Sequence, residues 1–307
     1  MKNRSVPFLF FGRRGPTDDT AAAVLLVLPA TAGLLLFIVL PFALAVGMSF
    51  TNLRLGSPLP LEFVGLRQYA RIFAEESVLR ALLNNLIFAS VVVPLQTALA
   101  LALALLLNRR VRGIVVFRAL FFLPVVFPLS LVAVVWVLLY APGPDGVLNS
   151  FLRLITFGAW EPIDFLHHPT YALPAVMLTS IWQGVGFQMI VLLAGLQEVP
   201  TVLHDAAAVD GAGAWRRFRH VTLPQLRSPL IFVVVVTTIL SFRVFDQVRI
   251  MTQGGPNDAS TTVVFEAVRA SFDRAQVARG AAITVTFFLI VLAITLLQRR
   301  FLRQEAL

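Results

Sequence analysis

The sequence predicts an all-α integral membrane protein with six transmembrane helices and both termini in the cytoplasm. The first supporting observation is composition: of 307 residues, 58% are hydrophobic and only 13% are charged. A soluble domain of this length keeps more charge on its surface, so the expected solvent is lipid. The second observation is a set of six long apolar stretches, and the third is the clustering of arginines at their ends.

Each apolar stretch can cross roughly 30 Å of hydrocarbon, which takes about 20 residues of helix. Lipid offers no hydrogen-bond partner to an open backbone, so each crossing is expected to be helical. The expected spans are 21–50, 82–107, 119–140, 171–195, 230–250 and 281–297. Prolines within them are expected to kink the helices without ending them.

The first span has two possible interpretations. Arg13 and Arg14 precede it, and the small residues around Thr31 resemble a signal-peptide cleavage site. The apolar run continues to Phe50, however, which is too long for a cleaved signal. We therefore expect a retained helix.

Orientation follows from the basic residues, of which 24 are Arg and one is Lys2. With both termini on one side, that side receives 15 of them and the other side receives 9, while Arg243 falls within a span. The more positive side is cytoplasmic. The expected division is a cytoplasmic tail over 1–20, a transmembrane domain over 21–298 and a second cytoplasmic tail over 299–307.

Composition also excludes several kinds of site. The chain has no Cys, which rules out disulfides and thiolate chemistry. Its sole Lys, Lys2, precludes a phosphate-binding loop of the G-x-x-x-x-G-K-[ST] kind, so any ATP that drives the protein must bind another chain. No residues suggest a metal or catalytic site. The arginines lie at the ends of apolar runs, which favours lipid headgroups over nucleic acid as their partners.

One expected cytoplasmic loop, 197–229, stands out from the others. Pro200 suits the first turn of a short helix that continues to Val209, and Gly211 permits the positive φ that ends it. A second short helix is expected from about Ala214 to Val221, with Pro224 ending it.

This loop resembles the signature of permease subunits of binding-protein-dependent ABC importers, in which E-A-A, three residues, G, nine residues and I-x-L-P follow one another. The chain keeps every spacing and departs twice, with Asp for Glu and Val for Ile. The matching or adjacent positions are Asp205, Ala206, Ala207, Asp210, Gly211, Val221, Leu223 and Pro224. The resemblance implies a type I importer permease fold, and implies that these residues dock on an ATPase.

Two further segments resemble carbohydrate-type permeases of the same class. They are Phe63-Val64-Gly65-Leu66 with Gln68-Tyr69, and Phe245-Asp246-Gln247-Val248 with Thr252-Gln253-Gly254-Gly255-Pro256. The resemblance covers nearly the whole chain and implies import of a sugar or sugar-like solute across the bacterial cytoplasmic membrane.

The resemblance also implies the partners: cytoplasmic ATPase subunits that carry ATP and Mg²⁺, a second and different permease, and an extracytoplasmic solute-binding protein. This chain then needs no cofactor and is not an enzyme. Asp205 is a plausible charge partner for a basic residue of the ATPase. The arginines at 216, 217 and 219 can also touch the ATPase, although the positive-inside rule alone accounts for them.

A sugar pathway is expected to present amides and aromatic rings, which meet hydroxyls and apolar sugar faces. The fourth span offers Trp182, Gln183, Phe187 and Gln188. The alternative for both glutamines is helix packing, because amides hydrogen-bond across membrane helices. Gly184 and Gly186 are expected to permit close packing.

Arg243 and Asp246 lie three residues apart in the expected fifth span, past the middle of the membrane. Charges at that depth are costly and usually face a cavity or a partner. We expect them to form a gate or interface pair, with each other or with the second permease. The alternative is that Arg243 extends to the outer interface.

Two other functions remain open from the sequence. An ABC permease for a polyamine, phosphate or amino acid would carry the same cytoplasmic loop. A stand-alone secondary transporter is disfavoured by that loop and by the absence of an evident repeated half.

Overall fold

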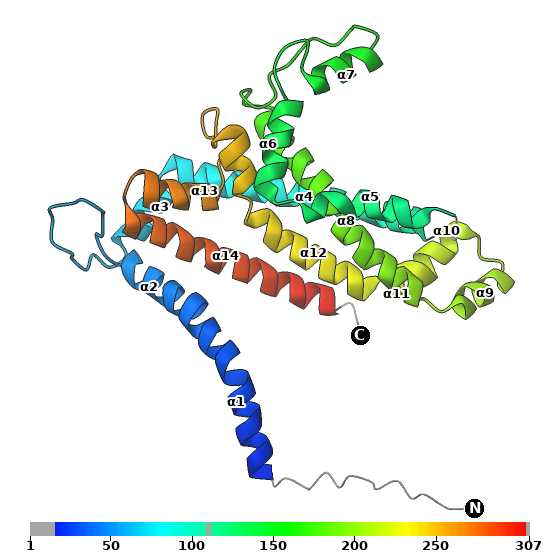
Figure 1. Ribbon diagram of the computed structural model, residues 1–307, viewed down its shortest axis with the longest axis horizontal. Coiled ribbons are helices and arrows are strands. Elements are labelled where there is room, and N and C mark those ends of the chain that lie inside the picture. The colour runs from blue at the N-terminus through cyan, green and yellow to red at the C-terminus, as the bar shows by residue number, and fades with distance from the viewer. Residues whose placement is uncertain (1–15, 109–111, 305–307) are drawn as a thin grey trace, which may run out of the picture.

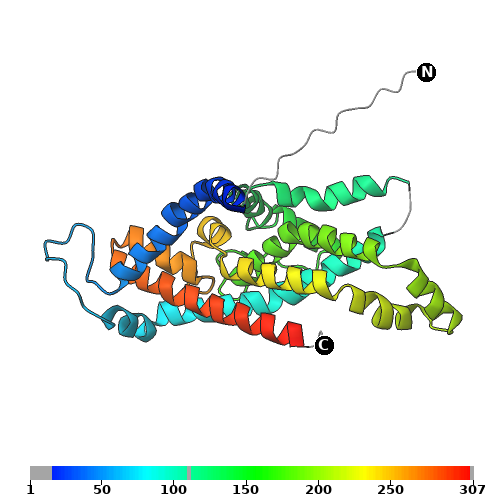
Figure 2. The same cartoon turned by 90° about the horizontal axis from the view of Figure 1, so that it is seen from below.

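The computed structural model describes residues 16–108 and 112–304, and within them the chain is helical apart from loops and one isolated bridge between Thr51 and Phe63. The long central helices lie side by side as an elongated bundle (Figures 1 and 2). Four of them are long and apolar enough to cross a membrane, and two bent helix pairs raise the number to as many as six.

The first span is one continuous helix composed of α1 (Pro16–Leu34), the π-helical turn η1 (Leu35–Val39) and α2 (Leu40–Ser49). Residues Ala23–Ser49 of it satisfy the length and hydropathy of a crossing, which agrees with the expected span. Only α2 packs on the bundle, against α14, while α1 diverges from it (Figure 1). The most apolar window of this helix is not buried at all.

The centre of the bundle is α4 (Glu76–Leu107) packed against α8 (Ala172–Glu198). Glycines on α8 let its neighbours approach closely, as expected from the sequence. A Cβ on Gly184 would contact the Gln96 amide of α4, and a Cβ on Gly186 would overlap the backbone of Phe121. The second and fourth expected spans are therefore both present, and α4 begins six residues earlier than predicted.

The third expected span is not a single straight helix, which corrects the prediction. It consists of α5 (Ile114–Val126) and α6 (Leu129–Leu139), which meet at 100°. Pro128 has no N–H for a helical bond and forces the preceding Phe127 into an extended conformation, with φ −79° and ψ 141°. From the bend, α6 leads away from the bundle to α7 (Val147–Ile155) (Figure 1).

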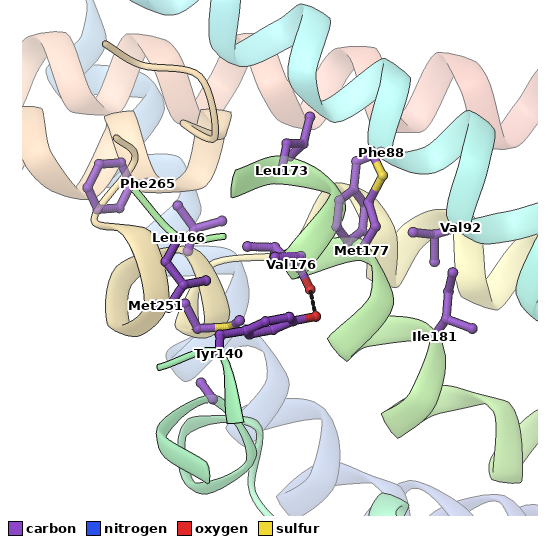
Figure 3. Close-up of a cluster of buried hydrophobic side chains, with 13 residues drawn as sticks. Phe88, Val92, Tyr140, Leu166, Leu173, Val176, Met177, Ile181, Met251 and Phe265 are labelled. Atoms are coloured by element: carbon purple, nitrogen blue, oxygen red, sulfur yellow. Dashed lines mark hydrogen bonds between the residues drawn. The ribbon is translucent and has the colours of Figure 1, made fainter. Parts of the chain in front are cut away.

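A buried cluster fixes α6 to α8 near this bend. Tyr140 is 1% exposed and donates a hydrogen bond from its hydroxyl to the carbonyl of Ala175, at 3.1 Å (Figure 3). Phe88 of α4 and Met251 complete the cluster from two other segments. Elements far apart in the chain thus share one apolar core.

The fifth expected span also ends early. Helix α12 (Arg227–Phe242) stops at Phe242, eight residues before the predicted end, and helical structure resumes only at Asp246, before the π-helical turn η3 (Val248–Thr252). The chain then turns through 253–262 into α13 (Val263–Val268), the π-helical turn η4 (Arg269–Asp273) and α14 (Val277–Gln304). Helix α14 contains the sixth expected span.

Asn85 of α4 explains how α12 can end inside the bundle. Its amide nitrogen donates to the carbonyl of Phe242 at 3.1 Å, and its amide oxygen accepts from the backbone nitrogen of Val263 at 2.9 Å. Asn85 is fully buried. One side chain thus satisfies the last turn of one helix and the first turn of another, groups that would otherwise be unpaired in an apolar environment.

The remaining short elements cover the two ends of the bundle. At one end lie α3 (Arg67–Ala74) and α13, and an ion pair between the partly exposed Glu75 and the buried Arg279 joins the starts of α4 and α14 there. At the opposite end lie α9 (Thr201–Val209), α10 (Ala214–Arg217), the π-helical turn η2 (Phe218–Thr222) and α11 (Leu223–Gln225) (Figures 1 and 2).

Replacing Asn85 with Leu should lower the thermal unfolding midpoint of the purified complex. The change leaves two buried backbone groups unpaired, each at a cost of about 1–3 kcal/mol. Ser90→Ala is the matched control on the same helix, because the Ser90 side chain is exposed and bonds only to the carbonyl of Ile87. Equal midpoints for the two variants would show that Asn85 does not hold the break.

Candidate functional site

The expected docking loop forms a compact pair of helices joined by a tight turn. Helix α9 ends in a backbone cap in which the amide of Gly211 donates to the carbonyl of Ala208 at 3.1 Å, and the amide of Ala212 donates to the carbonyl of Ala207 at 2.9 Å. This is the bond pattern of a Schellman motif, and it requires a positive φ at Gly211. The observed φ of Gly211 is +75°, as the sequence predicted.

The second helix of the loop is longer than expected, and Pro224 does not end it. Helical structure continues from Ala214 through η2 and α11 to Gln225, and Pro224 lies in the first turn of α11. In the wider π-helical turn, the amide of Leu223 bonds to the carbonyl of Phe218. The helix thus changes its bonding just before the residue that has no N–H. The change of direction, 67°, comes after Gln225.

The surface that this loop presents carries large apolar side chains together with acidic and basic ones. Val202 is 71% exposed, Val209 88% and Trp215 69%. Asp205 and Asp210 are exposed as well, and neither forms an ion pair within the described part of the chain. Such a patch at a loop end is typical of a protein contact. The sequence analysis did not single out Val209 or Trp215, although large apolar residues in an expected cytoplasmic loop were the available signal.

The structure separates the candidate pathway residues of α8. Trp182 is 44% exposed, while Gln183 and Phe187 are half-buried. Gln188 is fully buried and donates to the hydroxyl of Thr237 on α12, which is the helix-packing alternative. Gln183 and Gln188 are five residues apart and so point about 140° from each other around the helix.

Polar and aromatic groups of other segments also contact this part of α8. Trp136 of α6 contacts it edge-on, with ring centroids 5.6 Å apart. Ser180 donates to the amide oxygen of Gln247 at 2.5 Å, while the Gln247 amide nitrogen and the Trp136 indole nitrogen are buried without a partner in the described residues. Sequence reasoning missed Trp136 because α6 follows an unforeseen bend.

Arg243 and Asp246 differ from the prediction in geometry. They were expected one turn apart on a continuous helix, but the helix ends at Phe242 and the residues between them are not helical. Both are exposed, and no ion pair joins them in the described structure. Both line an otherwise mainly apolar cavity of about 780 Å³ bordered by α2, α12, α13 and α14.

Comparison with known proteins identifies the class. Residues 70–304 match the family of binding-protein-dependent transport system inner membrane components. The chain belongs to this family. It is therefore a multi-pass permease subunit of an ABC importer, the class that the loop motif indicated, and such subunits are not themselves enzymes.

Characterised relatives of this family resemble the chain over most of its length. The trehalose/maltose transport system permease protein MalF of Thermococcus litoralis is 33% identical, with 89% of this chain and 90% of that protein covered. The sulfoquinovosyl glycerol transport system permease protein SmoG of Agrobacterium fabrum is 33% identical, with 94% of this chain and 92% of that protein covered. The sn-glycerol-3-phosphate transport system permease protein UgpA of Yersinia enterocolitica is 32% identical, with 92% and 94% covered.

Solved structures support the fold of this family. A crystal structure of a bacterial ABC transporter that imports the acidic polysaccharide alginate superposes with a TM-score of 0.80, covering 94% of this chain and 96% of that one. Its complex with an alginate pentasaccharide-bound periplasmic protein gives 0.81 with the same coverage. The identity is 22% in both, so this likeness concerns the fold, which is the predicted importer permease fold.

The turn at Gly211 can be tested against a neighbouring glycine. A Cβ at Gly211 or Gly213 meets nothing within 4 Å, but Gly213 has an ordinary φ of −66°. Gly211→Val should therefore distort the loop and abolish solute uptake by the complex, because a β-branched residue disfavours positive φ. Gly213→Val should transport like the parent. Normal uptake by both variants at matched membrane levels would exclude a role for the turn in coupling.

Proposed function

We propose that this permease subunit imports a sugar or sugar-like solute. The relatives reported above are named for trehalose and maltose, sulfoquinovosyl glycerol and glycerol phosphate. The outer-loop motifs at 63–69 and 245–256 point to the same carbohydrate-type group. Polyols and sugars are thus the solutes that the chain is best suited to carry.

The loop of α9 to α11 is proposed to dock on a cytoplasmic ATPase subunit. The observation that carries this proposal is an exposed apolar surface, Val202, Val209 and Trp215, held at one end of the bundle by a backbone-capped turn. Asp205, which forms no ion pair within the described residues, adds a charge for a basic residue of the partner. ATP and Mg²⁺ are proposed to bind that partner, and this chain is proposed to need no cofactor.

The proposed topology has six crossings, with α5–α6 counted as one bent span, with α12 as the fifth crossing and with both termini in the cytoplasm. The tails are then 1–20 and 299–307, and the permease domain is 21–298. The 15 basic residues assigned to the α9–α11 side support the orientation. The membrane is proposed to be the bacterial cytoplasmic membrane. In this orientation α3, α13 and the Glu75–Arg279 pair lie on its extracytoplasmic side and face the binding protein.

The solute is proposed to pass along the side of α8 that bears Gln183 and Phe187, with Trp182 at its edge. Aromatic faces suit the apolar faces of a sugar, and the amide of Gln183 suits its hydroxyls. Gln188 is better assigned to packing, since it is buried against Thr237. A second permease completes the pathway, and the unburied first span offers it an apolar surface. Arg243 and Asp246 are proposed to face that second permease or the cavity that they line.

The proposal is tested by purifying the complete complex and measuring ATP hydrolysis with its binding protein and a panel of solutes. We expect a di- or monosaccharide, or a glycerol-linked sugar, to stimulate hydrolysis at least several-fold. Amino acids, polyamines and inorganic phosphate serve as the comparison set. Stimulation confined to that set would replace the sugar by another solute, whereas no stimulation by any solute would count against the importer role itself.

The bent third span makes the topology testable at one loop. Helix α5 alone has 13 residues, roughly 20 Å, which is short of a 30 Å core. If α5 and α6 cross together, a reporter enzyme active only outside the cytoplasm should work when fused after Gly146 and fail after Gly113. Equal signals at both sites would mean that α5 and α6 enter and leave on one side.

A further inference from the structure

A large cavity lies between the first span and the end of the bundle that holds α13. Its volume is about 780 Å³, and α2, α12, α13, η4 and α14 border it. Among the described residues, the first span lines it only through Phe42 of α2, because α1 diverges from the bundle (Figure 1). None of the described residues of α8 lines it. The cavity is therefore separate from the side of α8 that is proposed to carry the solute.

One wall of the cavity is a mainly apolar stripe along α14. The residues of this stripe are Thr284, Phe287, Phe288, Val291, Leu292 and Thr295. Their spacing of three or four places them on one face of the helix, and at 1.5 Å per residue the stripe is about 16 Å long. One leaflet of a bilayer contains about 15 Å of hydrocarbon, which is half of a roughly 30 Å core. The wall thus has the length of one acyl chain.

Two opposite charges line the same cavity. Arg243 and Asp246 are exposed, and neither side chain forms an ion pair or a hydrogen bond within the described residues. The remaining lining is uncharged in the part of the chain that the structure describes. Phe242, which precedes Arg243, lies beside Phe287, with ring centroids 6.3 Å apart. The charges are therefore near the start of the α14 stripe, and the hydrocarbon wall extends away from them.

We propose that this cavity binds a zwitterionic phospholipid, phosphatidylethanolamine. Its phosphate would pair with Arg243, its ammonium would donate hydrogen bonds to Asp246, and one acyl chain would lie along the α14 stripe. Phosphatidylcholine carries the same charges, but its quaternary ammonium has no N–H to donate. An anionic lipid would satisfy Arg243 and leave Asp246 facing a second negative group.

The depth of the two charges suits a lipid headgroup. Helix α12 has 16 residues, so Phe242 lies about 24 Å from the elbow at Arg227, most of the way across a roughly 30 Å core. Charges near the membrane boundary are costly unless they are paired or hydrated. In the orientation proposed above, this boundary is that of the outer leaflet, and the acyl chain would point toward the middle of the membrane.

A helix of the second permease is the competing occupant. Such a helix would have to place an acidic residue beside Arg243 and a basic residue beside Asp246, in addition to an apolar face along α14. One ethanolamine headgroup carries both charges and is already joined to the hydrocarbon. The lipid therefore satisfies all three features of the cavity with one molecule.

Lipid affinity of the intact complex tests the proposal. Native mass spectrometry would compare the dioleoyl forms of phosphatidylethanolamine, phosphatidylcholine and phosphatidylglycerol, without solute, binding protein or ATP. The parent should bind the ethanolamine lipid about fivefold more tightly than either of the others, and Arg243→Gln/Asp246→Asn should lose that preference. Arg249→Gln/Asp273→Asn should keep it, because that cation and anion bond to each other at 3.0 Å and are not offered to a headgroup.

Single changes separate the headgroup from the acyl chain. Asp246→Asn should weaken binding of the ethanolamine lipid and strengthen binding of the glycerol lipid, because the carboxylate that repels an anionic headgroup is gone. Leu292→Trp should weaken binding of all three lipids while both charges remain, because it fills the apolar wall. Leu297→Trp is the matched control, since Leu297 is 55% exposed on α14 and does not line the cavity.

The outcomes are separable. Equal affinities of the parent for the three lipids, or equal losses in the two double variants, would overturn the proposal. Loss of the second permease from the Leu292→Trp complex, with lipid affinities unchanged in the double variant, would assign the cavity to that subunit instead. If the double variant does not assemble, Asp246→Asn alone carries the test, since that side chain is exposed. Because solute and ATP are absent, failure here is distinct from failure of the importer assay.

Discussion

The hydrogen bonds of Asn85 are the constraint on which the outer half of the bundle depends. Helix α12 ends inside an apolar environment, where an unpaired carbonyl is costly. Asn85 satisfies that carbonyl and the first amide of α13 at once. The neighbouring Asn84 donates to the carbonyls of Asp258 and Thr261 at 3.0 Å each. The irregular segment between the two helices is therefore fixed by α4, and not by its own secondary structure.

A buried charge cluster strengthens the same region. Glu266 of α13 is fully buried and pairs with Arg269 at 2.5 Å, while Arg274 lies 4.0 Å from its other oxygen. Arg269 also lies over the ring of Phe265, and it reaches Asp258 in the preceding loop at 3.4 Å. Together with Asn85, these contacts join the break in the fifth span to the start of the sixth. These contacts thus connect residues 243–274 to α4 at several points.

Much of the fold followed from hydropathy because the membrane imposes a minimum length and a helical backbone on every crossing. The breaks did not. Phe127 and Pro128 are as apolar as their neighbours, and Pro94 lies inside an unbroken α4 although it is also a proline. The end of α12 depends on Asn85, a residue 157 positions away in the chain. The sequence also does not show which neighbouring helix a residue faces. Gln183 and Gln188 are chemically identical, and only the position of α12 makes one of them a packing residue.

The cap on α9 separates the shape of the loop from its surface chemistry. The turn is held by backbone bonds and by the freedom of one glycine, so the side chains at Val202, Asp205, Val209 and Trp215 take no part in building it. Their identities can therefore change during evolution without remaking the turn. A permease built this way can be matched to a different motor subunit by surface substitutions alone. The presence of Asp at position 205, where the family signature has Glu, is a small instance of that latitude.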